Sequence, residues 1–446
     1  MKNVKLGKLW DSLHSSYWFV PTIMAILAIA LAFGMLRLDR AGYYGPIEKW
    51  GWIYTGGAEG ARSLLSSVAS SVINVAGTAF SITIVALQLA ASNFGPRLLR
   101  NFMKDTGNQI VLGTFIGTFI YCLLILRTIQ GEGDSYNQFV PQLAVTVGIL
   151  LAIVSIGTLI YFIHHASTII QAAHVISEVS SDLDDTTDRL FPEKLGRSPS
   201  QSNRQVIEIP TDFDFVACPI KAKSSGYLQI VDDKELMQLA CDRNLLLRLE
   251  YRPGEFVVKG NNLVMAYPGK DVNPKLTGQI NDALILGKER TEQQDIEFPI
   301  NQLVEVALRA ISPAVNDPFT AIRCIDRLSA GLSRLAQREF PSPYRYDDND
   351  KLRIITQRVT FAQLTDAAFN QIRQYGKSDT AVSIRLLQAI ATVAPYTRTQ
   401  KDRAALRRHA EMIKRDSQEG ASQEFDRKDI EERYQTVVRL LEQDNH

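Results

Sequence analysis

The run from Ser63 to Pro96 contains no charged residue over 34 positions, and it constrains the fold more than any other part of the chain. A helix of this length measures about 51 Å, well beyond the ~30 Å hydrocarbon core of a bilayer. We therefore predict a membrane helix that tilts or projects beyond the bilayer. Gly95 and Pro96 are expected to end it.

One side of this predicted helix is polar. At about 100° per residue, hydroxyl, amide and glycine positions fall within one narrow sector, while leucine, valine, isoleucine and alanine point the other way. The members of this polar stripe are Ser63, Ser67, Ser70, Asn74, Gly77, Thr78, Ser81, Gln88 and Ser92. Because an unsatisfied polar group is costly in hydrocarbon, the stripe is expected to meet protein or a water-filled path.

Four segments are apolar and long enough to cross a bilayer. They cover roughly 17–38, 61–92, 108–129 and 140–163, within a transmembrane domain of residues 1–165. Lysines precede the first span, and Arg97, Arg100 and Lys104 lie between the second and third. Since positive charge favours the cytoplasmic side, both termini are predicted to be cytoplasmic.

The rest of the chain predicts an α+β region. A connecting helix and linker are expected over 166–204, a small β-rich subdomain over 205–290 and a helical subdomain over 291–446. The hairpin pattern of 252–263 is similar to that of barrel-sandwich domains, without the displayed lysine that a carrier domain needs. On the connecting helix, His174, Glu178 and Asp182 share one face, for which a solvated charged surface is a better interpretation than a metal site.

The densest polar cluster lies around the loop that joins two predicted helices. Asp295, Arg309, Asn316, Asp317 and Arg323 belong to it. As a ligand or ion pocket, it would bring Asp295 and Asp317 to face the two arginines. The structural alternative is that Asp317 caps a helix and the arginines form ordinary ion pairs.

Composition and motifs exclude several classes of protein. A net charge of +1 argues against a nucleic-acid partner. The four cysteines are scattered, so neither a disulfide framework nor a zinc cluster is expected. No phosphate-binding loop, nucleophile elbow or metalloprotease motif occurs, and we expect no enzyme, catalytic residue, metal or cofactor.

Two stretches of sequence carry a resemblance that covers nearly the whole chain. The first runs from Val75 to Ala90 and continues through Phe94–Gly95–Pro96–Arg97; the second combines Gln294–Asp295, Leu303–Val304 and 310–321. In this order they resemble the bacterial predicted membrane proteins grouped as domain of unknown function 2254. The resemblance implies a bacterial inner-membrane protein with a cytoplasmic C-terminal domain, in a family without a settled activity.

Two functional hypotheses follow. The first is a homo-oligomeric channel that conducts anions or small solutes, because the stripe has no acidic ring. Its predicted lining is Ser67, Ser70, Asn74, Thr78, Ser81, Gln88 and Ser92, and its cytoplasmic mouth is Arg97, Arg100 and Lys104. Packing competes with this hypothesis, since Ser63/Ser67, Gly77/Ser81 and Gly113/Gly117 are pairs of small residues four apart.

The second hypothesis is a membrane-anchored sensor or scaffold whose cytoplasmic domain binds a ligand or a protein partner. In that case the cluster near Asn316 is the functional site and the stripe is structural. The expected partners are the lipid bilayer and further copies of the chain, together with a small ion or solute if the channel hypothesis holds.

Overall fold

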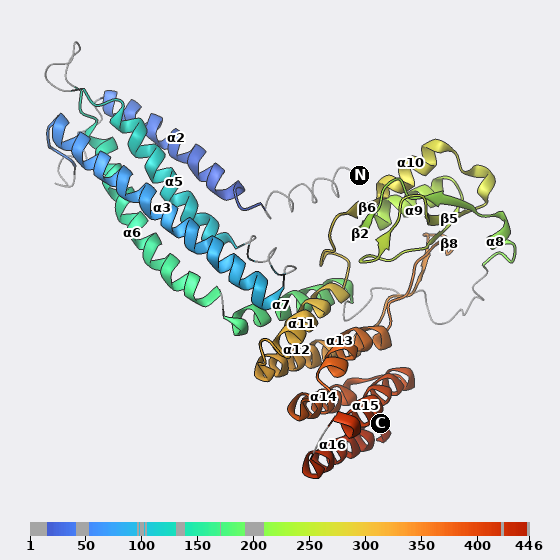
Figure 1. Ribbon diagram of the computed structural model, residues 1–446. Coiled ribbons are helices and arrows are strands. Elements are labelled where there is room, and N and C mark those ends of the chain that lie inside the picture. Colours follow the sequence, from blue (N-terminus) through green and yellow to red (C-terminus); the bar gives the residue numbers. More distant parts are fainter. Residues whose placement is uncertain are drawn as a thin grey trace. The chain divides into compact units, whose positions relative to one another are not determined.

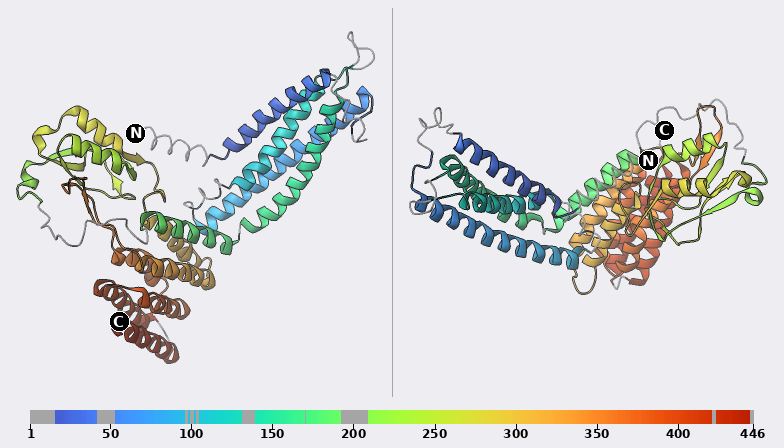
Figure 2. Two further views of the ribbon diagram at one scale, coloured as in Figure 1. Left: turned by 180° about the vertical axis from the view of Figure 1, so that it is seen from behind. Right: turned by 90° about the horizontal axis from the view of Figure 1, so that it is seen from above.

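The computed structural model describes residues 16–41, 53–95, 98, 102, 105–130, 139–169, 171–191, 209–420 and 423–443 (Figures 1 and 2). The chain forms two compact units, with the boundary between His174 and Val175. We refer to them as the membrane unit and the C-terminal unit. The boundary lies beyond the expected limit at residue 165 because the last membrane helix is longer than its apolar core.

The described residues of the membrane unit form a bundle of four long helices that lie side by side (Figure 1). They are α2 (Phe19–Arg40), α3 (Ala58–Phe94), α5 (Thr106–Leu126) and α6 (Gln142–Ile169). All four are long and apolar enough to span a membrane, as the sequence predicts. Helix α5 contacts each of the other three.

Small residues allow α2 to approach α5 closely. A Cβ atom on Gly113 would lie 2.4 Å from Met24 Sδ, and one on Gly117 would lie 3.4 Å from Ala28 Cβ. The predicted Gly113/Gly117 pair therefore packs one helix of the chain against another. The buried Tyr121 hydroxyl of α5 donates a hydrogen bond to the Ala144 carbonyl of α6 at 2.9 Å.

The segment predicted as one helix past the membrane forms parts of two helices. Helix α6 ends at Ile169, and α7 (Ala172–Leu190) belongs almost wholly to the C-terminal unit. Its acidic face is not simply solvated: Asp188 pairs with Arg334 and Arg338, each at 2.6 Å. The apolar face packs against α12 (Pro318–Ala336), where a Cβ atom on Gly331 would lie 2.5 Å from Leu183 Cδ2.

Two sheets form the β-rich part of the C-terminal unit. The five-stranded sheet has the order β1–β5–β3–β8–β7 and the three-stranded sheet the order β4–β2–β6. Their strands are β1 (Cys218–Lys221), β2 (Gly226–Val231), β3 (Leu246–Leu249), β4 (Phe256–Val257), β5 (Asn262–Tyr267), β6 (Leu284–Gly287), β7 (Tyr344–Tyr346) and β8 (Leu352–Ile355). The short helical elements are α8 (Phe213–Val216), α9 (Asp233–Asp242), η3 (Gly269–Asp271) and α10 (Pro274–Ala283).

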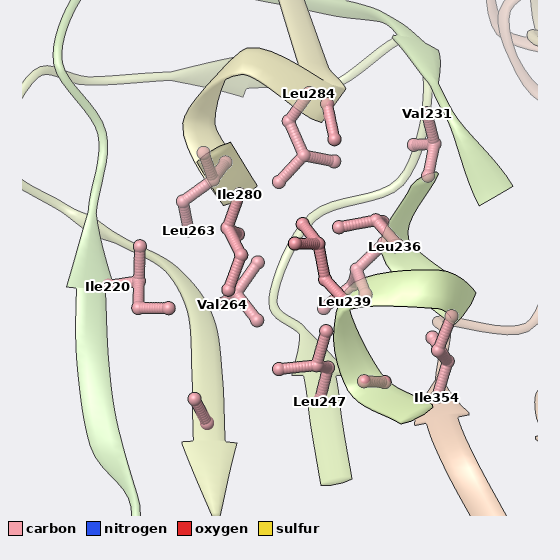
Figure 3. Close-up of a cluster of buried hydrophobic side chains, with 14 of the residues drawn as sticks. Ile220, Val231, Leu236, Leu239, Leu247, Leu263, Val264, Ile280, Leu284 and Ile354 are labelled. Atoms are coloured by element: carbon pink, nitrogen blue, oxygen red, sulfur yellow. The ribbon is translucent and has the colours of Figure 1, made fainter. Parts of the chain in front are cut away.

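Figure 3 shows the core that joins the sheets and helices. Leu236 and Leu239 from α9 and Ile280 from α10 converge with Val264 and Leu247 from the large sheet. All five side chains are buried. Because two helices contribute to this core, the region differs from the predicted barrel sandwich, whose core is built from strands alone.

Strands β7 and β8 lie within 291–446, which the sequence predicts to be a helical subdomain. They form a hairpin whose turn is held by Asp347, which accepts hydrogen bonds from the backbone of Asn349 at 2.9 Å and Lys351 at 3.0 Å. Strand β8 then pairs in parallel with β3, with Leu247 opposite Ile354. The large sheet is therefore completed by a segment about 100 residues downstream.

The remaining elements are helices packed in successive pairs. They are α11 (Glu297–Ala310), α12 (Pro318–Ala336), α13 (Phe361–Tyr375), α14 (Thr380–Val393), η4 (Ala394–Tyr396), α15 (Gln400–Gly420) and α16 (Glu424–Glu442). Local signals set several of their ends. Asp317 caps α12 with Pro318 at its first position, and Thr360 forms a capping box with Gln363 at the start of α13.

Candidate functional site

The polar stripe of α3 faces away from the other helices of its own chain. Ala61, Leu65, Ala69 and Ala76 on the opposite face are buried. All predicted pore-lining positions are exposed: Ser67, Ser70, Asn74, Thr78, Ser81, Gln88 and Ser92. The bundle is therefore held together by the apolar face of α3, and the stripe is available to water or to another molecule.

The hydroxyls and the carboxamides of the stripe differ in their hydrogen bonding. Thr78 and Ser81 donate to carbonyls one turn back in the helix, at 3.1 and 2.9 Å, and Ser92 donates to the Leu89 carbonyl at 3.0 Å. The side-chain carboxamides of Asn74 and Gln88 have no hydrogen-bond partner in the described part of the chain. Since a helix backbone cannot satisfy an amide side chain as it does a hydroxyl, these two groups require an external partner.

Packing within the chain does not explain the small residues of the stripe. A Cβ atom on Gly77 would meet nothing within 4 Å, whereas those on Gly113 and Gly117 would press on α2. The predicted pairs Gly77/Ser81 and Gly113/Gly117 thus have different surroundings. Only the pair on α5 is used for contacts between helices of one chain.

A second candidate site is a pocket of about 330 Å³ inside the C-terminal unit. It lies where the end of α7, the ends of β2 and β3, the start of α11 and the segments flanking β7 and β8 come together. Asp295, which the sequence analysis predicts as a site residue, is part of its wall. The volume is at the lower end of the range of small-molecule sites.

Asp295 is buried in a network of paired charges. Its carboxylate accepts a hydrogen bond from Arg290 at 2.7 Å and one from the backbone of Glu297 at 3.1 Å. Glu297 in turn accepts from Arg252 at 2.6 Å. Burial raises the pKa of Asp295 to about 6, although Arg290 acts in the opposite direction.

The turn before β4 covers this carboxylate. Gly254 has a φ of +94°, and a Cβ atom there would lie 2.3 Å from Asp295 Oδ2. Glycine is required here because other residues rarely adopt this backbone conformation. A side chain would also collide with the Asp295 carboxylate. The pocket wall at Asp295 is thus preformed.

The family comparison agrees with the presence of a membrane unit. The model of a family of predicted membrane proteins, DUF2254, matches residues 14–392. The chain belongs to the DUF2254 family. Uncharacterized proteins of Mycobacterium bovis and Mycobacterium tuberculosis are each 35% identical to it over 426 residues, which are 94% of this chain and 79% of the relative. No solved structure matches the chain significantly.

In this DUF2254 protein the residues predicted as one ligand pocket do not come together. Asp295 precedes α11 and Asp317 follows it, so the length of a 14-residue helix, about 20 Å, lies between them. Asp295 pairs with Arg290 rather than with Arg309, which lies 3.7 Å from Glu305 of the preceding turn. The cluster is split because its members are close in sequence but lie at opposite ends of one helix.

The downstream half of that cluster serves to start α12. Asp317 accepts hydrogen bonds from the Thr320 backbone at 3.1 Å and from its hydroxyl at 2.6 Å. These bonds lower the pKa of Asp317, and Arg323 adds a smaller effect in the same direction. Asn316 has a φ of +50°, in the left-handed region that asparagine tolerates in a turn. The structural alternative therefore accounts for these residues.

The basic residues of the predicted mouth, Arg97, Arg100 and Lys104, lie outside the described residues. The arginines that line the pocket are not among the site residues predicted from the sequence; they are Arg189, Arg252, Arg345 and Arg358. The sequence does contain a signal for two of them. Tyr-Arg-Tyr and Leu-Arg-Ile-Ile flank the turn-forming run Asp-Asp-Asn-Asp, which is a hairpin pattern. Arg345 lies in that hairpin and Arg358 just after it.

Proposed function

We propose that this membrane protein is a homo-oligomeric channel of the bacterial inner membrane, in which the polar faces of several α3 helices line the path. The observation that carries the proposal is the outward direction of the stripe. Asn74 and Gln88 are both exposed, and neither side-chain carboxamide has a hydrogen-bond partner among the described residues. Hydrocarbon cannot satisfy these groups, whereas a water-filled path can.

Oligomerisation is part of the proposal because the centre of a single bundle is filled. Phe115, Tyr121 and Ile125 of α5 are all at most 1% exposed. Side chains packed in this way leave no room for a continuous path through one copy. A path is available only between copies, where α3 helices face each other.

The chemistry of the stripe favours anions or small neutral solutes. No carboxylate occurs between Ser63 and Pro96, and cation channels commonly use acidic rings. Arg97, Arg100 and Lys104 follow the run and are assigned to a cytoplasmic mouth on the positive-inside rule. With four spans, both termini and the C-terminal unit are cytoplasmic, and that unit regulates the path. The proposal assigns no enzymatic step, cofactor or metal to the chain.

Close packing between copies is the competing explanation for the stripe. It accounts for the serines and glycine, since small residues let helices approach. It accounts less well for Asn74 and Gln88, which lie 14 positions and almost four turns apart on the same face. The two explanations therefore differ most at these carboxamides.

The test is to record currents from purified protein in planar bilayers. Asn74→Leu is expected to lower or abolish the single-channel conductance, because it removes a hydrated group from the path. Ile73→Leu is the matched control, since Ile73 is also exposed on α3 but lies about 100° away from Asn74. Absence of current in every condition, or an Asn74→Leu variant that conducts like the wild type, would refute the channel. A monomeric particle in the bilayer would refute it independently.

The pocket beside Asp295 supports a second candidate function, a membrane-anchored sensor whose C-terminal unit binds a ligand. A thermal-shift screen of small molecules on the whole chain tests it. Hits that depend on the pocket should lose their effect in Arg358→Ala and keep it in Asp317→Ala, because Asp317 caps α12 and does not line the pocket. Molecules that stabilise the Arg358→Ala variant as much as the wild type would show that the ligand binds outside the pocket.

A further inference from the structure

The pocket in the C-terminal unit contains more guanidinium groups than its carboxylates neutralise. Arg189, Arg345 and Arg358 line it, and none of the three lies within salt-bridge distance of a carboxylate among the described residues. Arg189 donates to the Glu292 carbonyl at 2.7 Å, and Arg345 donates to the Ser342 carbonyl. Arg358 is exposed and makes no hydrogen bond within the described part of the chain.

A fourth arginine of the wall has one unused donor. Arg252 is bound through Nη2 to Glu297 and through Nε, at 3.4 Å, to Glu255. Its Nη1 atom is buried and has no hydrogen-bond partner. Leaving a buried donor of a charged group without a hydrogen bond costs free energy. An acceptor of a bound molecule is therefore expected at this atom.

The acidic residues of the wall are already engaged. Asp295 is bound by Arg290 and Glu297 by Arg252, so neither remains free to neutralise an arginine of the wall. Asp233 lies close enough to Arg345 for their charges to interact, yet makes no ion pair with it. The uncompensated charge of the pocket is therefore positive.

The rest of the wall is apolar or aromatic. Phe191, Tyr251, Ile296 and Val359 contribute to it. Phe191 is buried and packs at 4.9 Å against Phe340, which holds its ring in place. A pocket with a cationic side and an apolar side recognises a molecule that has both kinds of group.

We infer that this pocket binds a small phosphorylated molecule with an apolar or aromatic body. The phosphate oxygens accept hydrogen bonds from Arg358, Arg345 and Arg189, and the body lies against Phe191 and Val359. Several convergent arginines suit a phosphate better than a carboxylate, because a phosphate offers more acceptor oxygens and a larger negative charge. The inference rests on the second candidate function and is independent of conduction.

The experiment is isothermal titration calorimetry of the whole purified chain in detergent micelles. The probes are adenosine monophosphate, inorganic phosphate and adenosine. We expect adenosine monophosphate to bind most tightly and adenosine most weakly, with an affinity that falls as salt is added. Arg358→Ala should weaken binding of the monophosphate at least about tenfold, and Arg358→Glu should abolish it.

Folding controls are available because Arg358 is exposed. Both variants should keep the circular dichroism spectrum of the wild type. Arg398→Ala is the matched control, since Arg398 is exposed outside the pocket and should leave the Kd unchanged.

Three results would overturn the inference. One is that neither phosphate-bearing probe binds, and another is that both Arg358 variants bind the monophosphate like the wild type. The third is that adenosine binds as tightly as the monophosphate; this would refute the phosphate assignment and leave ligand binding by the pocket in place. The thermal-shift screen tests ligand binding of any kind, so the two failures are distinguishable.

Discussion

Asp39 is predicted to be a main determinant of the stability of the membrane unit. Its carboxylate lies in the last turn of α2, is 3% exposed and accepts hydrogen bonds from the first turn of α6. Oδ1 accepts from the Leu143 backbone at 3.0 Å and Oδ2 from the Ala144 backbone at 2.9 Å. One side chain thus caps a helix that begins more than 100 residues later, and its negative charge interacts favourably with the positive end of the α6 dipole.

The cost of removing this cap can be worked out from these contacts. Asp39→Ala leaves two buried N–H groups without a partner, at about 1–3 kcal/mol each. Loss of the charge at the helix N-terminus adds about 0.5–1 kcal/mol. We therefore expect the free energy of unfolding of the membrane unit to fall by about 4 kcal/mol. Asp39→Asn keeps one acceptor oxygen and should cost about half as much.

The assay uses the distribution of tryptophan. All four tryptophans of the chain, Trp10, Trp18, Trp50 and Trp52, lie before residue 174. Their fluorescence during titration with a denaturing detergent therefore reports the membrane unit alone. Ser81→Ala, an exposed change on α3, is the control and should alter the free energy by less than about 0.5 kcal/mol. An Asp39→Ala variant within 1 kcal/mol of the wild type would refute the capping argument.

Three further predictions concern the C-terminal unit and are checked by circular dichroism during unfolding. Asp317→Ala should cost about 1 kcal/mol through loss of the α12 cap, without changing ligand binding in the pocket; an altered ligand affinity would contradict this assignment. Gly254→Ala should cost at least about 1–3 kcal/mol, because of its positive φ and the contact with Asp295. Burial lowers the pKa of His409, so below pH 6.5 the folded state binds fewer protons than the unfolded state. The free energy of unfolding therefore falls as the pH falls, by at most about 1.4 kcal/mol per pH unit for this group. His409→Gln should flatten that pH dependence, and an unchanged slope would exclude His409 as its source.

Elements set by local physics could be predicted from the sequence. The four apolar segments each became a membrane-length helix, because hydrophobic length decides what can cross a bilayer. Asp317 caps α12 and Pro318 is its first residue, as the structural alternative in the sequence analysis requires. Each of these signals acts over a few residues, through periodicity or a cap.

Other features depend on which residues meet after folding. Hydropathy showed a two-sided α3, but only the packing against α5 and α6 decided that its polar side faces outward. The hairpin of β7 and β8 joined a sheet whose other strands lie far upstream, and the pocket combined arginines from separate segments with Asp295. The sequence by itself therefore determined the spans, the stripe on α3 and the caps, since each arises from neighbours along one element. Only the tertiary structure decided the direction of the stripe, the partner of Asp295 and the cap that Asp39 places on α6, because these contacts depend on which surfaces of distant segments pack together.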